Sequence, residues 1–126
     1  MALAFTPSRA DIVMCNFDLA FVPPEMRKTR RVVIVSPRSY NRSGRAIVVS
    51  FSASVPKHSL PSHVRFKTGS YRSLSVEVWA ICDCVAHVSF RRLDRVALGK
   101  GFIVDRIASE DMARIADGLK QAMSLG

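Results

Sequence analysis

The residues best suited to chemistry in this chain are an arginine, a hydroxyl and a carboxylate in one cationic stretch. Arg30 carries a planar guanidinium, which can bind two phosphate oxygens and stabilise charge that develops at phosphorus. Ser52 offers a hydroxyl to a phosphate oxygen, and Glu25 could pair with the arginine and hold it in place. In RNA the 2′-OH is a built-in nucleophile, so the protein would need none. Cutting a phosphodiester is one option among several that these residue types allow.

The positive charge of the chain is concentrated around these residues. The 126 residues carry 19 Lys and Arg and 10 Asp and Glu, a net charge of +9. Residues 25–72 hold eleven cations and one anion, or +10, and the other 78 residues sum to −1. This one-sided block predicts a polyanionic partner, nucleic acid first, because Lys and Arg displace counterions condensed on phosphates. An acidic protein partner and a simple solvated face remain open.

Other kinds of site have weaker support. The three histidines have no spacing that indicates an acid–base pair. Cys82-Asp83-Cys84 with His87 looks like half of a metal site, but structural zinc usually needs four ligands from two paired motifs. Three cysteines make no disulfide framework. We therefore expect buried thiols, with no metal and no cofactor.

The apolar pattern predicts the elements that position these residues. Short β-branched and apolar runs predict strands at residues 11–17, 30–36, 45–54, 63–66, 74–85 and 95–98. Prolines, glycines and polar residues predict loops at residues 18–24, 41–44, 55–62 and 67–73. Residues 90–93 fit one helical turn.

The C-terminus changes to helical periodicity. Ser109 can cap a helix whose first turn holds Glu110 and Asp111, where they complement the helix dipole. An apolar stripe follows at Met112, Ile115, Ala116, Leu119 and Met123, which we expect to pack on the sheet. The sum is a single domain over residues 1–126, a small, strongly curved sheet or barrel. No apolar run approaches the ~20 residues of a membrane span and no secretory signal is recognisable, so a cytoplasmic protein is expected.

The order of these motifs resembles the PemK/MazF family, the toxins of type II toxin–antitoxin systems. The early blocks are Asp11-Ile12-Val13, Glu25-x4-Arg30, Val32-Val33-Ile34-Val35-Ser36-Pro37, Tyr40-Asn41 and a strand that ends at Ser52. Later blocks are Leu60-Pro61-Ser62-His63-Val64, Cys82-Asp83 and Val88-Ser89-Phe90-Arg91-Arg92-Leu93. The resemblance therefore covers nearly the whole chain.

The resemblance implies a fold and an activity. The fold is α+β, mainly β: a homodimeric SH3-like barrel of five to seven short strands with a C-terminal helix. The activity is metal-independent, sequence-specific cleavage of single-stranded RNA, which leaves a 2′,3′-cyclic phosphate and a 5′-OH and stops translation and growth. A cognate acidic antitoxin would cover the RNA groove. The family's catalytic arginine falls on Arg30, its catalytic threonine on Ser52, and Glu25 takes a supporting role.

The chain departs from the family pattern at three positions. Arg31 replaces a proline, Ser52 replaces the threonine, and Ala10 replaces the glycine before Asp11. Residues 23–28 and 55–62 would line the groove, and Phe51 or Tyr40 could stack a base or be buried. The predicted RNA contacts are the nearby cations and one histidine: Arg27, Lys28, Arg31, Lys57, His63 and Arg65. Two alternatives are a non-enzymatic CcdB-like toxin that binds DNA gyrase and a nucleic-acid-binding module without activity.

Overall fold

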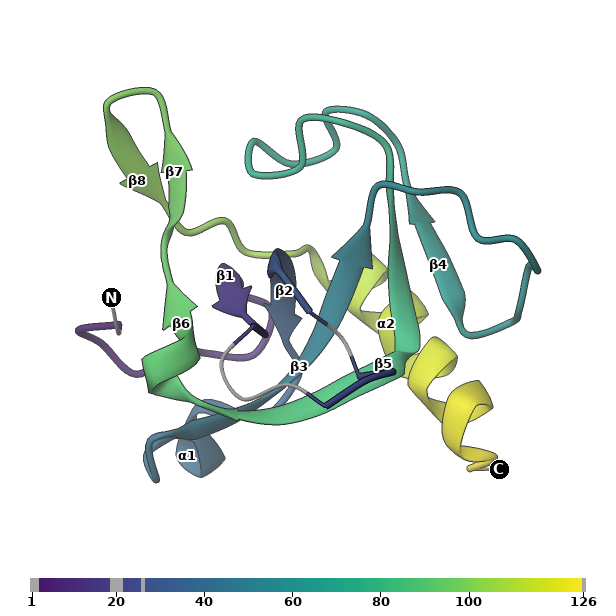
Figure 1. Ribbon diagram of the computed structural model, residues 1–126, viewed down its shortest axis with the longest axis horizontal. Coiled ribbons are helices and arrows are strands. Elements are labelled where there is room, and N and C mark those ends of the chain that lie inside the picture. The colour runs from purple at the N-terminus through teal and green to yellow at the C-terminus, as the bar shows by residue number, and fades with distance from the viewer. Residues whose placement is uncertain (1–2, 19–21, 26, 126) are drawn as a thin grey trace.

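The computed structural model describes residues 3–18, 22–25 and 27–125. Its main layer is an antiparallel sheet of six strands in the order β4-β5-β3-β2-β1-β6, and Figure 1 shows how strongly it curves. The strands are β1 (Ile12–Asn16), β2 (Thr29–Ile34), β3 (Arg45–Ser52), β4 (His63–Phe66), β5 (Val78–Ser89) and β6 (Leu93–Asp94). The predicted mainly β fold with a C-terminal helix is confirmed.

Short elements complete the chain around this sheet. A separate hairpin, β7 (Val96–Leu98) and β8 (Gly101–Ile103), projects beyond β6 (Figure 1). One helical turn, α1 (Arg38–Asn41), connects β2 to β3, and a 3₁₀ turn, η1 (Phe90–Arg92), joins β5 to β6. The helix α2 (Ser109–Met123) ends the chain. No helix in the described ranges is long and apolar enough to cross a membrane.

The apolar runs of the central strands are buried on both faces of the sheet. Successive strand residues point to opposite sides. Val33 therefore joins a large cluster with Val49, Phe51 and the α2 residue Ile115. Val32 joins the second cluster, and its other members include Val13, Cys15, Val48 and Leu93. The continuous β-branched run therefore reflects a strand covered on both sides.

The helix α2 packs on β5 and β4 along part of its predicted stripe. Met112 and Ile115 are buried, but Met123 is 47% exposed, so the buried stripe ends before the last turn. The helix follows Ala108, which makes no side-chain cap, and Ser109 is the first helical residue, so its predicted capping role is wrong.

Several element boundaries differ from the prediction because non-local pairing decides them. The strand predicted at residues 74–85 is β5, which starts at Val78 and continues to Ser89, while Val76 is 52% exposed. The turn predicted at residues 41–44 follows α1, whose Asn41 is fully buried and donates from Nδ2 to Pro7 O at 2.9 Å. Strands β6 and β8 were not predicted, because they have only two and three residues. Of the loop predicted at residues 18–24, residues 19–21 lie outside the described ranges.

Candidate functional site

Arg30 and Ser52 share one face of the sheet at the same end of two neighbouring strands. Val32 of β2 pairs with Ser50 of β3. Continuing that register by two residues aligns Arg30 with Ser52, and the period of two directs both side chains to the same face. Arg31 points to the other face. The sheet therefore separates two consecutive arginines.

Two rows of side chains extend this face across β3, β5 and β4. Ser52 lies opposite Trp79, which lies opposite Arg65. In the next row Ile81 stands between Ser50 and His63. Trp79 is half-buried and is the cross-strand partner of Ser52. Sequence reasoning missed Trp79, whose only signal was its place in a predicted strand.

An irregularity in β5 borders the same site. Ile81 pairs with Ser50 and Val85 pairs with Val49, so residues 82–84 stand between them without a partner on β3. Insertions of this kind bend a strand, and Figure 1 shows a sharp bend along β5. Burial raises the pKa of the Cys84 thiol, the Asp83 carboxylate raises it further, and the Arg30 guanidinium opposes the increase. The insertion thus brings Cys84 within electrostatic range of Arg30.

The imidazole of His63 supports Asp83. Its Nδ1 accepts a hydrogen bond from Leu60 N–H at 3.3 Å, and its Nε2 lies 3.5 Å from Asp83 Oδ1. A nitrogen that accepts a hydrogen bond carries no proton, so this geometry fits a neutral ring with its proton on Nε2, facing the carboxylate. The His63 side chain is only 10% exposed, which leaves little of it for the predicted RNA contact.

The predicted pairing of Glu25 with Arg30 is not formed. The Glu25 carboxylate accepts from Val22 N–H at 2.7 Å and so caps its own loop. Arg30 Nε donates to Arg27 O at 3.0 Å, and no ion pair joins the two within the described part of the chain. Ser52 Oγ makes two contacts with the Ser54 backbone, at 3.2 and 3.4 Å, which tether the hydroxyl at the end of β3.

The other predicted RNA contacts lie around this face or beyond it. Lys57 is exposed in the loop between β3 and β4. Arg27 lies 3.7 Å from Asp18, and Asp18 also accepts from Lys28 N–H at 2.6 Å. Arg65 forms an ion pair with Glu77, so its charge is partly neutralised.

Neither aromatic residue proposed as a stacking platform is suitably placed. Phe51 points into the core and meets Phe66 edge-on, with ring centroids 5.6 Å apart. Tyr40 is 71% exposed, but it belongs to α1, at the opposite end of β2 from Arg30. Trp79 is the aromatic residue that the register places next to Ser52.

Cys82 is used for packing between the sheet and α2. Its Sγ lies 3.7 Å from Ile115 O, and burial raises the pKa of its thiol to about 11. Among the described residues, no group of three or more His, Cys, Asp and Glu side chains is placed to hold a metal ion.

The same fold occurs in solved toxin structures. The chain is similar to MazF from Deinococcus radiodurans, with 17% identity, a TM-score of 0.74, and coverage of 96% of this chain and 99% of that one. It is similar to an endoribonuclease from a mycobacterial species, solved with its cognate antitoxin, with 20% identity, a TM-score of 0.65, and coverage of 95% of this chain and 97% of that one. It is also similar to the MazE–MazF complex of D. radiodurans, with 16% identity, a TM-score of 0.67, and coverage of 97% of this chain and 99% of that one. A comparison with curated proteins finds no match.

These likenesses define the fold as that of the MazF toxins. The family model of the PemK-like, MazF-like toxins of type II toxin–antitoxin systems matches residues 8–123. The chain belongs to this family.

Proposed function

We propose that this toxin is a metal-independent endoribonuclease that cuts single-stranded RNA, messenger RNA in particular, and so stops translation and growth. One feature supports the proposal: the register of β2, β3 and β5, continued two residues beyond the last β2–β3 pair, puts Arg30, Ser52 and Trp79 on one face. A phosphate clamp, a hydroxyl and an aromatic ring side by side fit a strand whose base is stacked and whose phosphate is held. Enzymes of this kind act where messenger RNA is, which is the cytoplasm.

The reaction is an internal transfer at phosphorus. The 2′-oxygen of the RNA attacks the adjacent phosphate, the new bond closes a 2′,3′-cyclic phosphate, and the bond to the 5′-oxygen breaks. Arg30 binds the non-bridging oxygens, whose negative charge grows in the transition state, and Ser52 orients the phosphate. We assign the proton of the 2′-OH to Asp83, since its carboxylate is half-exposed and faces His63, which stands in the row next to that of Ser52. The departing 5′-oxygen takes a proton from water.

Binding of the strand and of protein partners follows from the same face. Trp79 stacks a base, while Arg27, Lys28 and Lys57 contact the backbone from the flanking loops. Glu25 stabilises the loop that carries Arg27 and Lys28 through its bond to Val22. We further propose a homodimer and a cognate acidic antitoxin that covers this face, since two similar structures contain an antitoxin.

A cleavage assay tests the assignment. We expect Arg30→Ala to slow cleavage of a varied RNA pool, in the presence of a chelator, by about 10²–10³-fold, and Ser52→Ala to slow it less. The products should end in a 2′,3′-cyclic phosphate and a 5′-OH by mass spectrometry. Arg38→Ala and Ser75→Ala are matched controls, because both residues are exposed and lie outside this face.

Two results would contradict this proposal. Unchanged cleavage by both site variants would remove the assignment of Arg30 and Ser52. A wild-type protein that cuts no RNA, but still arrests growth when it carries Arg30→Ala, would point to a non-enzymatic toxin instead.

A further inference from the structure

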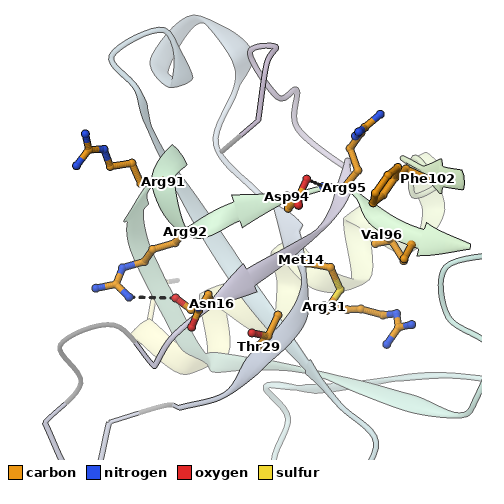
Figure 2. Close-up of a pocket in the computed structure, with 11 residues that line it drawn as sticks. Met14, Asn16, Thr29, Arg31, Arg91, Arg92, Asp94, Arg95, Val96 and Phe102 are labelled. Atoms are coloured by element: carbon orange, nitrogen blue, oxygen red, sulfur yellow. Dashed lines mark hydrogen bonds between the residues drawn. The ribbon is translucent and has the colours of Figure 1, made fainter. Parts of the chain in front are cut away.

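A second cationic site lies on the opposite face of β2, where Arg31 points. It is a cleft of about 370 Å³ between the ends of β1 and β2, the 3₁₀ turn with β6, and the hairpin β7–β8. Figure 2 shows Arg92 with Asn16 toward one end and Arg31, Arg95 and Phe102 toward the other. A volume of this size is that of a small-ligand site.

The positive charge of the cleft is created by folding. Arg91, Arg92 and Arg95 lie outside residues 25–72, in the part of the chain whose total charge is −1. The turn after β5 carries them to Arg31, so four arginines line the cleft with one carboxylate, Asp94. The local charge is therefore +3, and the linear charge pattern conceals it.

Contacts hold two of the arginines in defined positions. Arg92 Nη1 donates to Asn16 O at 3.0 Å, and the guanidinium carbon of Arg95 lies 4.2 Å from the centroid of the Phe102 ring. Arg31 Nε is buried and has no hydrogen-bond partner within the described part of the chain. An anionic oxygen that entered the cleft would satisfy this donor, whose isolation is otherwise costly.

The lining favours phosphate over an acidic peptide. A peptide segment would need an open apolar slot for its anchoring side chains. Here Val96 is buried, Met14 is half-buried, and one face of Phe102 is covered by Arg95. Phe102 as a whole remains half-exposed, and the four guanidinium forks around the cleft match the geometry of phosphate oxygens.

We propose that this cleft binds the phosphodiester backbone of the RNA strand that flanks the cleaved segment. The inference rests on the proposed function, and it adds a subsite on the far side of the strand that carries Arg30. Arg30 and Arg31 are consecutive, so one peptide unit of β2 joins the two sites. A strand that passes round the end of β2 would contact both.

Salt-dependent binding tests the cleft without requiring cleavage. The probes are 2′-O-methyl RNAs of about six and about thirty nucleotides, since ssRNA sites cover roughly 4–16 nucleotides. These probes lack the 2′-OH nucleophile, so they bind without being cut. The protein variant that removes two cations of the cleft is Arg91→Gln/Arg95→Gln. We expect the long RNA to bind several-fold more weakly, with a salt slope lower by about 1.4 for two lost phosphate contacts. The short RNA should bind unchanged.

Controls separate the cleft from general charge. Arg38→Gln/Arg72→Gln removes two exposed cations elsewhere and should lower the slope less. Arg91→Lys/Arg95→Lys keeps the charge and should restore most of the binding.

Three results would overturn the proposal: an unchanged slope for the long RNA, equal weakening of both RNAs, or a glutamate-rich peptide that competes at the cleft without affecting RNA. If RNA is still cut while the salt slope of the variant is unchanged, only the proposal for the cleft is rejected. If RNA binding depends on the cleft but no RNA is cut, only the proposed nuclease activity is rejected.

Discussion

At the scale of residues, the direction of each side chain decides its part in the site. Arg30 and Arg31 are neighbours in sequence, yet they point to opposite faces of the sheet because side chains alternate along β2. Ala10 is a second example: its φ is +83°, a conformation that favours glycine, and its N–H and C=O both bond to neighbouring strands and loops. The positive φ at this position therefore explains why the family pattern has a glycine before Asp11.

Trp79 provides a residue-scale prediction, because it is the only tryptophan in the chain. Binding of a non-cleavable RNA should change its fluorescence, since a stacked base covers the ring. Trp79→Ala should weaken binding by about 1–3 kcal/mol, and Trp79→Phe should retain much of the affinity. Tyr40→Ala is the control and should bind like the wild type. Fluorescence that stays constant at saturating RNA would exclude stacking on Trp79.

At the scale of elements, a glycine sets how closely α2 approaches the sheet. A Cβ at Gly118 would lie 2.7 Å from Cys82 Sγ and 3.2 Å from a methyl of Val64. Glycine usually weakens a helix by about 1 kcal/mol relative to alanine, so packing outweighs propensity here. The apolar stripe that the sequence predicts along α2 omits Gly118, because glycine has no apolar side chain to mark the buried face.

We therefore predict that Gly118→Ala destabilises the protein, because overpacking typically costs about 1–3 kcal/mol and exceeds the gain in helix propensity. In a Cys82→Ala background the main clash is gone, and the same change should be neutral or stabilising. Urea unfolding of the four proteins in this double-mutant cycle measures the coupling. Strictly additive effects would show that α2 does not depend on this contact.

At the scale of the whole molecule, the two buried clusters each enclose a thiol. Burial raises the pKa of Cys15 from its usual 9.0 to about 12, an effect that the Arg92 charge partly opposes, and raises that of Cys82 to about 11. Above pH 9 the thiols of the unfolded chain lose their protons, whereas the buried thiols of the folded protein keep them, so folding takes up protons.

The resulting prediction is a loss of stability at alkaline pH. The thiols contribute fully below pH 9, and the contribution falls as the pH rises toward the folded values of about 11 and 12. Unfolding free energies from urea titrations between pH 8 and pH 11 should decrease more steeply for the wild type than for Cys15→Ala/Cys82→Ala. Equal slopes would show that other groups account for the alkaline loss.

Sequence alone determined much of this protein, because local patterns encode local structure. The β-branched runs marked the central strands, and the period of 3.6 marked α2. The order of motifs identified the family and selected Arg30 and Ser52, whose catalytic roles stay predictions. A period of two also implies that neighbouring residues such as Arg30 and Arg31 face opposite ways.

Tertiary structure alone decided which distant residues meet, because strand register and irregular segments depend on partners far away in sequence. The pairing of β3 with β5 brought Trp79 to Ser52, and the unpaired residues 82–84 brought Cys84 toward Arg30. The turn after β5 moved three arginines next to Arg31. No local pattern carries such information, since each contact follows from backbone hydrogen bonds that form only when the whole sheet closes.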